Sequence, residues 1–511
     1  MRTDRYVLLM ESLLNQLGMG PVMMALFVCS GVILAGPIGE ETERLVQRAN
    51  LGGGVAAFYI ADLDTGEELA SHNADTALIP ASTMKLLTTG TALRVLGSDF
   101  VFRTELIVDE SVSPPVLIIR GDGDPALGDP AIFVDEEPGV EVGLLFDQIT
   151  AALKSAGITA VSEVVVDDRV FDRTYTHPDW PLDQLNRWYC AQVGGLNLHT
   201  NVINVYTRPS TSGTPVVRLA PDAYWVQLEV RAKSNRKSRD TAWVSRPTKN
   251  NSFTVHGNVS VQSEIPVAVD TPPLFAGRVI ADAIDERGIS VGIGDQSAVS
   301  AVRLWELRDQ FDDARTVAVI TTPLADVLRR VNTNSHNLYA EALLKRIGHA
   351  VTSDPGSWEN GGAVVRMTLA EEIGASAAES TLISDGSGMS RENRVTPSTF
   401  VAWMRSLAKS DDWEPFVESL AIPGEGTLRS RFIRDELHSE LYAKSGYLTG
   451  TYALAGVIEH PRTKQRVVFS IMLNDVKAGS TTRNAKPLID DIVEEIDLYL
   501  QEQAGEPVMG G

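Results

Sequence analysis

Three short motifs, separated by long stretches of chain, most constrain how this sequence can fold. They are Ser82-Thr83-Met84-Lys85, Ser335-His336-Asn337 and Lys444-Ser445-Gly446. The first two begin 335 − 82 = 253 residues apart, so something of domain size is inserted between them. If the three motifs form one site, the domain that carries them must be discontinuous in sequence.

The first motif contains a serine and a lysine that could activate it as a nucleophile. A serine hydroxyl is a poor nucleophile at neutral pH and needs a base beside it. Residues three apart share a helix face, so Lys85 can lie within reach of Ser82. Leu78-Ile79-Pro80-Ala81 leads into the motif and predicts a helix start, whose free N–H groups and positive dipole end favour a developing anion. A Ser-x-x-Lys motif occurs often by chance, so alone it is weak evidence for a catalytic serine. Here the residues around the motif strengthen that interpretation.

The triplet Ser-His-Asn occurs twice in the sequence, and only one copy is followed by a predicted helix. Ser71-His72-Asn73 lies in a polar hairpin or loop stretch and is expected at the surface. Ser335-His336-Asn337 is followed by apolar residues at helical spacing through 338–345. The second copy is therefore the candidate, with a hydroxyl and an amide at a helix start.

The third motif lies in the most strand-like part of the sequence. Residues 441–458 and 466–473 predict two adjacent antiparallel strands, and a glycine beside Ser445 would let a substrate backbone approach closely. A β-hairpin is predicted between about residues 54 and 70, and an amphipathic helix over 485–503 is expected to cover the resulting sheet.

With these motifs the chain resembles the serine-type D-alanyl-D-alanine carboxypeptidases and endopeptidases of the low-molecular-mass class C penicillin-binding proteins, peptidase family S13. Four further signatures extend the resemblance from about residue 50 to 495: Arg120 to Pro125, Val165 to Asp168 with Phe171, Asp385 to Arg391, and Pro423 to Leu428. The resemblance implies an α+β fold. Its catalytic domain would be β-lactamase/transpeptidase-like, an antiparallel sheet flanked by helices, with a large β-rich insert of one or two small domains.

The motifs and the resemblance together divide the chain. The catalytic domain is expected at 41–95 plus 316–505, with inserted accessory domains at 96–315 and a tail at 506–511. Within the insert, a helix is plausible at 142–156. Short β-like segments recur there at 102–108, 116–120, 161–166, 202–206, 225–230 and 255–261.

The resemblance implies catalytic roles for five residues. Ser82 would attack a D-alanyl-D-alanine-type peptide bond, and Lys85, held unprotonated by a neighbouring cation and partial burial, would take its proton. Ser335 would relay that proton to the leaving amine, Asn337 would hold Lys85 and a substrate amide, and Lys444 would orient the substrate's terminal carboxylate.

The resemblance also implies a set of substrate-binding residues. Ser445 would add a hydroxyl to the carboxylate site, Gly446 would keep the strand edge open, and the backbone N–H groups of Ser82 and Tyr447 would meet the oxyanion. Arg391 and Asp167 are candidates for the stem-peptide side chain, although each could equally be a structural ion pair or turn residue. His336 is expected to point away from the chemistry, and Asp385-Gly386-Ser387-Gly388 to be a tight loop beside the cleft.

The composition limits the classes of ligand and partner that this protein is expected to bind. A formal net charge of −22 over 511 residues argues against nucleic acid or an anionic lipid surface. The eight histidines show no paired metal spacing, so no metal or cofactor is expected. Cys29 and Cys190 form no disulfide framework, and Cys190 is expected to be a small buried hydrophobe.

The N-terminus indicates the compartment. Arg2 and Arg5 precede an apolar stretch at 22–35 that is short for a membrane span and suits a signal-peptide core. Residues 1–40 are therefore predicted to be a signal peptide, giving a periplasmic or cell-envelope protein. A retained anchor that contacts the membrane is the alternative.

Three functions remain open from the sequence. The leading one is an exported serine DD-peptidase that acts on peptidoglycan stem peptides as a carboxypeptidase, an endopeptidase or both, and is acylated by β-lactam antibiotics. A β-lactamase-like hydrolase on the same core is the second, and the long insert and the lack of a dedicated deacylation glutamate count against it. The third is a non-catalytic peptidoglycan-binding protein, which the three reactive motifs count against.

Overall fold

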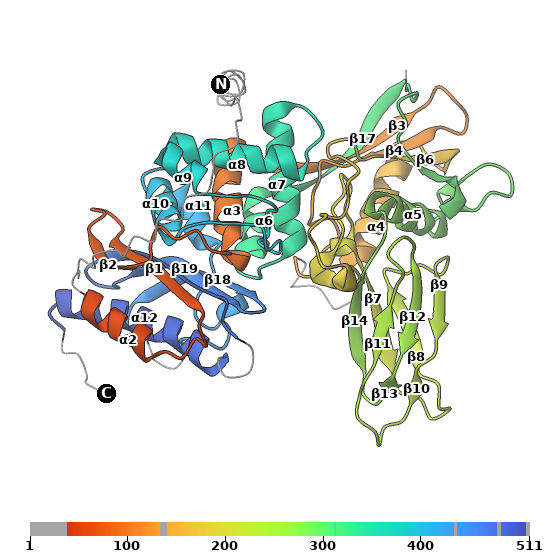
Figure 1. Ribbon diagram of the computed structural model, residues 1–511. Helices are drawn as coiled ribbons and strands as arrows, with labels where there is room; N and C mark the ends of the chain where they lie inside the picture. Colours follow the sequence, from red (N-terminus) through yellow and green to blue (C-terminus); the bar gives the residue numbers. More distant parts are fainter. Residues whose placement is uncertain (1–37, 133–140, 312, 434–436, 478–481, 507–511) are drawn as a thin grey trace, which may run out of the picture.

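The computed structural model describes residues 38–132, 141–311, 313–433, 437–477 and 482–506 (Figure 1). Its first sheet joins the two ends of the described chain in the order β18-β19-β20-β1-β2, with every neighbouring pair antiparallel. The strands are β1 Val55–Asp62, β2 Glu68–His72, β18 Glu440–Leu448, β19 Thr451–Glu459 and β20 Arg466–Asn474. The predicted hairpin and the pairing of distant segments are confirmed.

One strand prediction is wrong in detail. The run 441–458, predicted as one strand, is itself a hairpin that turns between β18 and β19. Gly450 occupies this turn with a φ of 79°, a left-handed conformation that glycine adopts without steric cost. The sheet therefore contains one more strand than the sequence pattern suggested, and β18 lies at its edge.

Helices cover both faces of this sheet (Figure 1). Side chains of β1 alternate between the faces: Phe58 and Ile60 pack in one apolar core, and Ala57 and Ala61 in the other. The first core is closed by α2 Gly39–Arg48 and by α12 Thr482–Gln503, the helix predicted at 485–503. The second face carries α3 Lys85–Leu96, α6 Leu324–Asn332, α7 Asn337–Thr352, α8 Trp358–Ile373, α9 Ala375–Glu379, α10 Pro397–Leu407 and α11 Trp413–Glu418.

A second sheet lies beside this three-layer body (Figure 1). Its order is β16-β6-β4-β3-β17, and β4, β6 and β16 run parallel to one another. The strands are β3 Val101–Asp109, β4 Val116–Arg120, β6 Glu163–Asp167, β16 Val302–Leu304 and β17 Ala314–Pro323. It is accompanied by α4 Glu141–Ser155, α5 Pro272–Glu286 and the short parallel pair β5 Ala160–Val161 and β15 Ser290–Val291. Strand β17 thus continues beyond residue 315, where the insert was expected to end.

The rest of the insert is a set of small sheets. They are ordered β14-β7-β8, β11-β12-β9 and β10-β13. Their strands are β7 Val202–Arg208, β8 Val216–Ala220, β9 Gln227–Val230, β10 Lys233–Ser234, β11 Trp243–Ser245, β12 Ser252–His256, β13 Asn258–Val259 and β14 Ser263–Ala268. Residues of these strands and of the second sheet share one apolar core, so the whole β-rich insert packs as a unit.

A tight turn fixes Ser82 among these elements. Residues Ala81–Met84 form a single 3₁₀ turn, η1, and α3 begins at Lys85. Two glycines allow neighbouring segments to pack against this turn. A Cβ on Gly446 would lie 2.8 Å from the Pro80 carbonyl oxygen, and a Cβ on Gly388 would lie 1.8 Å from the Ala81 carbonyl oxygen. At Gly446, the close approach predicted for a substrate backbone is made by the chain's own turn.

We expect Gly388→Ala to lower the melting temperature more than Gly157→Ala. The two glycines have φ values of 82° and 83°, so each variant carries a backbone cost of about 1–2 kcal/mol. A Cβ at Gly157 meets no atom within 4 Å, whereas one at Gly388 overlaps the Ala81 carbonyl and adds about 1–3 kcal/mol. Thermal unfolding followed by circular dichroism checks this, and equal shifts for the two variants would contradict the packing described here.

Candidate active site

The amine of Lys85 lies at the centre of the first two motifs. Its Nζ is 3.1 Å from Ser82 Oγ, 2.8 Å from Asn337 Oδ1 and 2.6 Å from the Ser387 carbonyl oxygen. The Lys85 side chain is completely buried. A serine hydroxyl therefore faces an amine that is enclosed and held in place by two other acceptors.

Lys444 brings the third motif to the same place. Its Nζ donates to Ser335 Oγ at 2.9 Å and to the Ser445 carbonyl oxygen at 2.8 Å, and its side chain is also completely buried. The three motifs thus converge, from η1, the start of α7 and the edge strand β18. The other copy of the second motif ends β2, where His72 Nδ1 lies 2.9 Å from a carboxylate oxygen of Glu43.

Burial controls the protonation of both lysines. Removal from water lowers the pKa of Lys85 to about 7, against the opposing effect of the carboxylates of Glu341 and Asp385. Burial also lowers the pKa of Lys444, and the like charge of Lys85 lowers it further. The expectation of partial burial is therefore corrected, since burial of Lys85 is complete and is the largest cause of its lowered pKa.

Two buried carboxylates fix the loop that contacts Lys85. Glu341 accepts the N–H groups of Gly386 at 3.0 Å and Ser387 at 2.8 Å, and the indole N–H of Trp358 at 2.8 Å. Asp385 accepts the N–H groups of Gly388 and Ser390 and the indole N–H of Trp180. These bonds present the Ser387 carbonyl to Lys85, and they bring two negative groups near its amine.

Sequence reasoning missed Glu341. It read 338–345 only as an apolar helix and 385–388 only as a loop with tight turns. The signal available in the sequence was a glutamate inside this apolar run. In the structure Glu341 is completely buried, as are Ala340 and Ala342. Burial raises the pKa of the Glu341 carboxyl.

The backbone at the site is held in uncommon conformations. Ala81, just before Ser82, has a φ of 47°, and Ser335 has a φ of 60°. Non-glycine residues adopt such values at a cost, and they cluster at functional sites where the surroundings enforce them. Asn337 begins α7, and its Nδ2 donates to the Tyr189 carbonyl at 2.9 Å, which fixes the direction of its amide.

The remaining residues of the third motif lie along the edge of the sheet. Ser445 is half-buried, and Tyr447 is 59% exposed. Among the described residues, the outer side of β18 is paired only by the isolated bridge between Ala421 and Ala443, so the edge after residue 443 is open to an added strand. Arg391 lies next to this edge, where its Nη2 donates to the Thr449 carbonyl at 2.7 Å.

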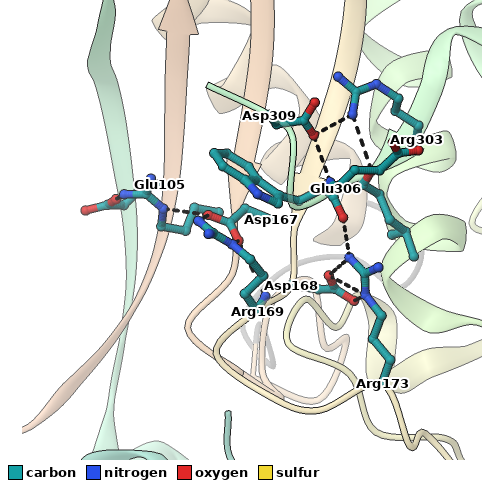
Figure 2. A network of polar contacts seen from close by, with 11 residues as sticks. Glu105, Asp167, Asp168, Arg169, Arg173, Arg303, Glu306 and Asp309 are labelled. Atoms are coloured by element: carbon teal, nitrogen blue, oxygen red, sulfur yellow. Dashed lines mark hydrogen bonds and ion pairs between the residues drawn. The ribbon is translucent and has the colours of Figure 1, made fainter. Parts of the chain in front are cut away.

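Asp167 lies elsewhere, on β6 of the second sheet (Figure 2). Its carboxylate contacts Arg120 Nε at 3.0 Å and Arg169 Nε at 2.7 Å. Burial alone would raise its pKa, but the hydrogen bonds from Arg169 and Arg120 hold it below the ordinary value. These contacts correspond to the structural ion pair that the sequence left open for this residue.

His336 and Cys190 are both buried beside the site. Burial lowers the pKa of His336 to about 3, so its imidazole is neutral. Its ring packs against Trp188 and Tyr339, with centroids 5.6 Å and 4.9 Å away. Cys190 Sγ lies 3.6 Å from Met389 Sδ, and burial raises its pKa, in keeping with a small apolar residue.

In the part of the chain that the structure describes, one group of side chains has the composition of a metal site: His438, His460 and Glu506. The backbone N–H groups of Arg462 and Thr463 donate to His460 Nδ1, so the proton of the neutral ring belongs on Nε2. That nitrogen faces Glu506 and cannot offer a lone pair to a metal in this tautomer. Glu506 also forms an ion pair with Arg462, so its carboxylate is already engaged by the protein.

No helix within the described ranges is long and apolar enough to cross a membrane. The predicted signal segment, 1–40, lies almost wholly outside the described residues, which begin at Ile38.

Comparisons with known proteins find relatives along most of the chain. The chain is 29% identical over 458 residues to a D-alanyl-D-alanine carboxypeptidase of Actinomadura sp. strain R39, covering 85% of this chain and 80% of the relative. It is 24% identical over 468 residues to D-alanyl-D-alanine carboxypeptidase DacB of Haemophilus influenzae, covering 88% and 91%.

Solved structures show the same fold. The crystal structure of penicillin-binding protein 4 from Haemophilus influenzae matches with a TM-score of 0.72 at 22% identity, covering 91% of this chain and 99% of that one. A predatory endopeptidase of Bdellovibrio bacteriovorus matches with a TM-score of 0.51 at 14% identity, covering 87% and 94%. These matches confirm the predicted α+β, transpeptidase-like fold class.

The family model for the D-Ala-D-Ala carboxypeptidase 3 (S13) family matches residues 40–495. This match confirms the resemblance inferred from the motifs and places the chain among the serine peptidases. The chain belongs to the D-Ala-D-Ala carboxypeptidase 3 (S13) family.

Proposed function

We propose that this protein is a serine-type D-alanyl-D-alanine carboxypeptidase that acts on peptidoglycan stem peptides through an acyl-serine intermediate at Ser82. The observation that carries the proposal is the contact of 3.1 Å between Ser82 Oγ and the buried amine of Lys85. Family membership supplies the reaction class, and the geometry supports the residue roles.

Acylation begins with Lys85 as the general base. With a pKa of about 7, its amine is substantially neutral at physiological pH and can take the proton of Ser82 as Oγ attacks the carbonyl carbon. The oxyanion that forms is met by the backbone N–H groups of Ser82 and Tyr447. Ser335, which accepts from Lys444 at 2.9 Å, relays the proton taken by Lys85 to the leaving amine as its bond to the carbonyl carbon breaks, and Lys85 is neutral again.

Substrate binding uses the open edge of β18. An extended peptide pairs with the free backbone groups beyond residue 443, as a strand added to a sheet. Lys444 and Ser445 hold the terminal carboxylate, Gly446 keeps the edge close to the turn of Ser82, and Asn337 binds a substrate amide while it accepts from Lys85. Arg391 is a candidate for the stem-peptide side chain. For Asp167, engaged by two arginines, the geometry favours an ion-pair role.

A β-lactamase-like hydrolase is the weaker alternative. A class A serine β-lactamase uses a glutamate that is free to activate water on the acyl-enzyme. The two carboxylates whose charges act on Lys85, Glu341 and Asp385, are completely buried and occupied by loop N–H groups. A purely binding role is weaker still, because it gives no reason to bury two lysine amines against serine hydroxyls.

We also propose that the protein is exported and works on the cell wall from the periplasm or envelope. Arg2, Arg5 and the apolar stretch 22–35 support a signal segment, cleaved or retained as an anchor at the membrane. The substrate named for the family, a D-alanyl-D-alanine peptide, is a component of the cell wall.

The first test is acylation by a β-lactam. Penicillin-binding protein 4 of Haemophilus influenzae has been crystallised with a β-lactam. We expect labelled penicillin to form a stable adduct on the wild-type protein and none on Ser82→Ala, because the acyl bond forms at Ser82 Oγ. Intact-mass spectrometry measures the adduct. Rapid turnover would favour the β-lactamase alternative, and the absence of any adduct would overturn the catalytic role.

Digestion of purified muropeptides then separates the two peptidase activities. Release of free D-alanine from uncrosslinked pentapeptides identifies carboxypeptidase action, which we expect. Conversion of crosslinked dimers to monomers identifies endopeptidase action. Ser82→Ala should form neither product if the same serine catalyses both reactions.

The pH dependence of kcat/KM tests the role of Lys85. Because the neutral amine is the active form and its pKa is about 7, we expect kcat/KM to rise with pH through about 7 and to fall tenfold per pH unit well below it. A profile that is flat between pH 5 and 9 would show that another group is the base.

Glu341→Gln should move that profile. The negative charge of Glu341 raises the pKa of Lys85, so its removal lowers the pKa, and the acid limb shifts to lower pH. Glu372→Gln is the matched control, since Glu372 pairs with Arg94 and Ser406 and should leave the acid limb in place. A shift in the opposite direction for Glu341→Gln would mean that its main effect is to hold the 385–390 loop.

A further inference from the structure

Lys345, on α7, is a buried lysine that the proposed mechanism does not use. It lies four residues after Glu341, so the two side chains leave the same face of the helix. Its side chain is completely buried, as are those of Lys85 and Lys444. A buried ammonium is strongly disfavoured unless it is paired and hydrogen-bonded, so its contacts show what keeps it at this position.

The insert satisfies the Lys345 ammonium on one side. Its Nζ donates to Asp172 Oδ1 at 2.6 Å and to the Thr174 carbonyl oxygen at 2.8 Å. Both residues belong to the segment 171–180, which follows β6 in the insert. The same segment contacts the chain between α7 and α8, where the Asp172 N–H donates to the Gly356 carbonyl oxygen at 3.0 Å. Lys345 therefore lies where the insert meets α7.

The same ammonium lies over the face of an indole. Its Nζ is 3.8 Å from the ring centroid of Trp358, the first residue of α8. A cation over an aromatic face is attracted to it, most strongly when both groups are removed from water, and Trp358 is only 7% exposed. Two rings of the insert, His177 and Trp180, contact this indole as well, with centroids 4.9 Å and 5.9 Å away. Lys345 and the insert together fix the position of Trp358.

Trp358 connects this cluster to the loop beside the active site. Its indole N–H donates to Glu341 Oε2 at 2.8 Å, and Glu341 Oε1 accepts the backbone N–H of Ser387 at 2.8 Å. The Ser387 carbonyl oxygen in turn accepts from Lys85 Nζ at 2.6 Å. A chain of direct contacts thus runs from Lys345 to the general base.

We propose that Lys345 is a positioning residue for acylation, through which the insert fixes the Trp358 indole and thereby the loop that contacts Lys85. The proposal rests on the proposed function, because it concerns the geometry of the general base. It also gives the insert a part in catalysis, since Asp172 holds the amine. An alkyl side chain of similar length would fill the space without binding either the indole face or the carboxylate.

The charges around Lys345 support a cation at this position. Burial lowers the pKa of Lys345, and the carboxylates of Asp172 and Glu341 act in the opposite direction. The Asp172 side chain is 32% exposed, so water can solvate its carboxylate when the amine is removed. Glu341 keeps its N–H donors from the loop and from Trp358. We therefore expect Lys345→Met to fold.

The first test separates catalysis from substrate binding on the full chain, with a stem pentapeptide that ends in D-alanyl-D-alanine. We expect Lys345→Met to lower kcat/KM about tenfold to a hundredfold, because the general base is misplaced. Added to Ser82→Ala, Lys345→Met should leave the Kd of the uncleaved pentapeptide unchanged in isothermal titration calorimetry, because the strand edge at β18 is untouched. A loss of kcat/KM that is matched by an equal rise in Kd would overturn the proposal.

Arg346→Met is the matched control. Arg346 is the next residue on α7, and its Nε lies 2.9 Å from Asp122 Oδ1 of the insert, so this variant also removes a cation that joins the helix to the insert. It leaves the contact between Lys345 and Trp358 in place, and we expect kcat/KM to stay within about twofold of the wild-type value. Equal losses in Arg346→Met and Lys345→Met would overturn the proposal, because contact with the insert in general would then be responsible.

A double-mutant cycle tests whether Lys345 acts through Trp358. Trp358→Phe removes the indole N–H that Glu341 accepts and keeps an aromatic ring. Because both changes release the same loop, adding Lys345→Met to Trp358→Phe should lower kcat/KM by less than about threefold. Losses that multiply in full would show that Lys345 acts independently of Trp358 and would contradict the proposal.

The indole N–H resonance of Trp358 gives a readout that does not depend on catalysis. It is identified in ¹H–¹⁵N spectra by its absence from Trp358→Phe protein. We expect Lys345→Met to shift this resonance and to speed its exchange with solvent, and Arg346→Met to leave it in place. An unmoved resonance in Lys345→Met would overturn the proposal.

Two further outcomes are covered. If Lys345→Met does not fold, Asp172→Asn replaces it, because this variant keeps the amine and removes its carboxylate partner. It should then give a smaller loss of kcat/KM and a smaller shift of the indole resonance, and no change in either would overturn the proposal. If the wild-type protein hydrolyses no peptide, the proposed function fails, and the indole resonance alone decides whether Lys345 holds Trp358.

Discussion

The complete burial of the Lys85 amine is the constraint on which the rest of this site depends. A charged ammonium is strongly disfavoured away from water, so its surroundings must satisfy it while allowing it to lose its proton. Ser82 Oγ, Asn337 Oδ1 and the Ser387 carbonyl receive its hydrogens, and the carboxylates of Glu341 and Asp385 limit the fall in its pKa. The balance of these effects is a base that is close to half-protonated at neutral pH.

That burial requires segments from far apart in the chain to meet at close range. The 3₁₀ turn of Ser82, the edge strand β18 and the 385–390 loop pack so tightly that glycine is needed at 388 and 446. The loop is in turn held by carboxylates from α7 and from its own first residue. The sheet that carries β18 is built from both ends of the described chain.

The three motifs and the family resemblance that they carry predicted that Ser82, Lys85, Ser335, Asn337 and Lys444 would meet in one site. Local patterns predicted the hairpin between about residues 54 and 70 and the helix over 485–503, whose alternation and period are properties of short segments. The turn at Gly450, which splits the run 441–458, was not predicted, because only the short break Thr449-Gly450-Thr451 separates two β-rich segments.

Long-range electrostatics could not be predicted from sequence. Glu341 resembles an ordinary helix residue until the loop N–H groups and Trp358 are brought to it from other segments. Asp167 was a candidate for substrate binding by its place in a signature, and only the three-dimensional arrangement shows that Arg120 and Arg169 occupy its carboxylate (Figure 2). In both cases the decisive partner lies on a different element.

The most direct measurement of the central claim is an NMR titration of protein labelled with ¹³C at the lysine ε-carbons. The account predicts a resonance that titrates near pH 7 and is absent from Lys85→Met protein. Titration of every lysine resonance near the ordinary value of about 10.4 would contradict it, because Lys85 would then be a permanent cation and could not act as the base for Ser82.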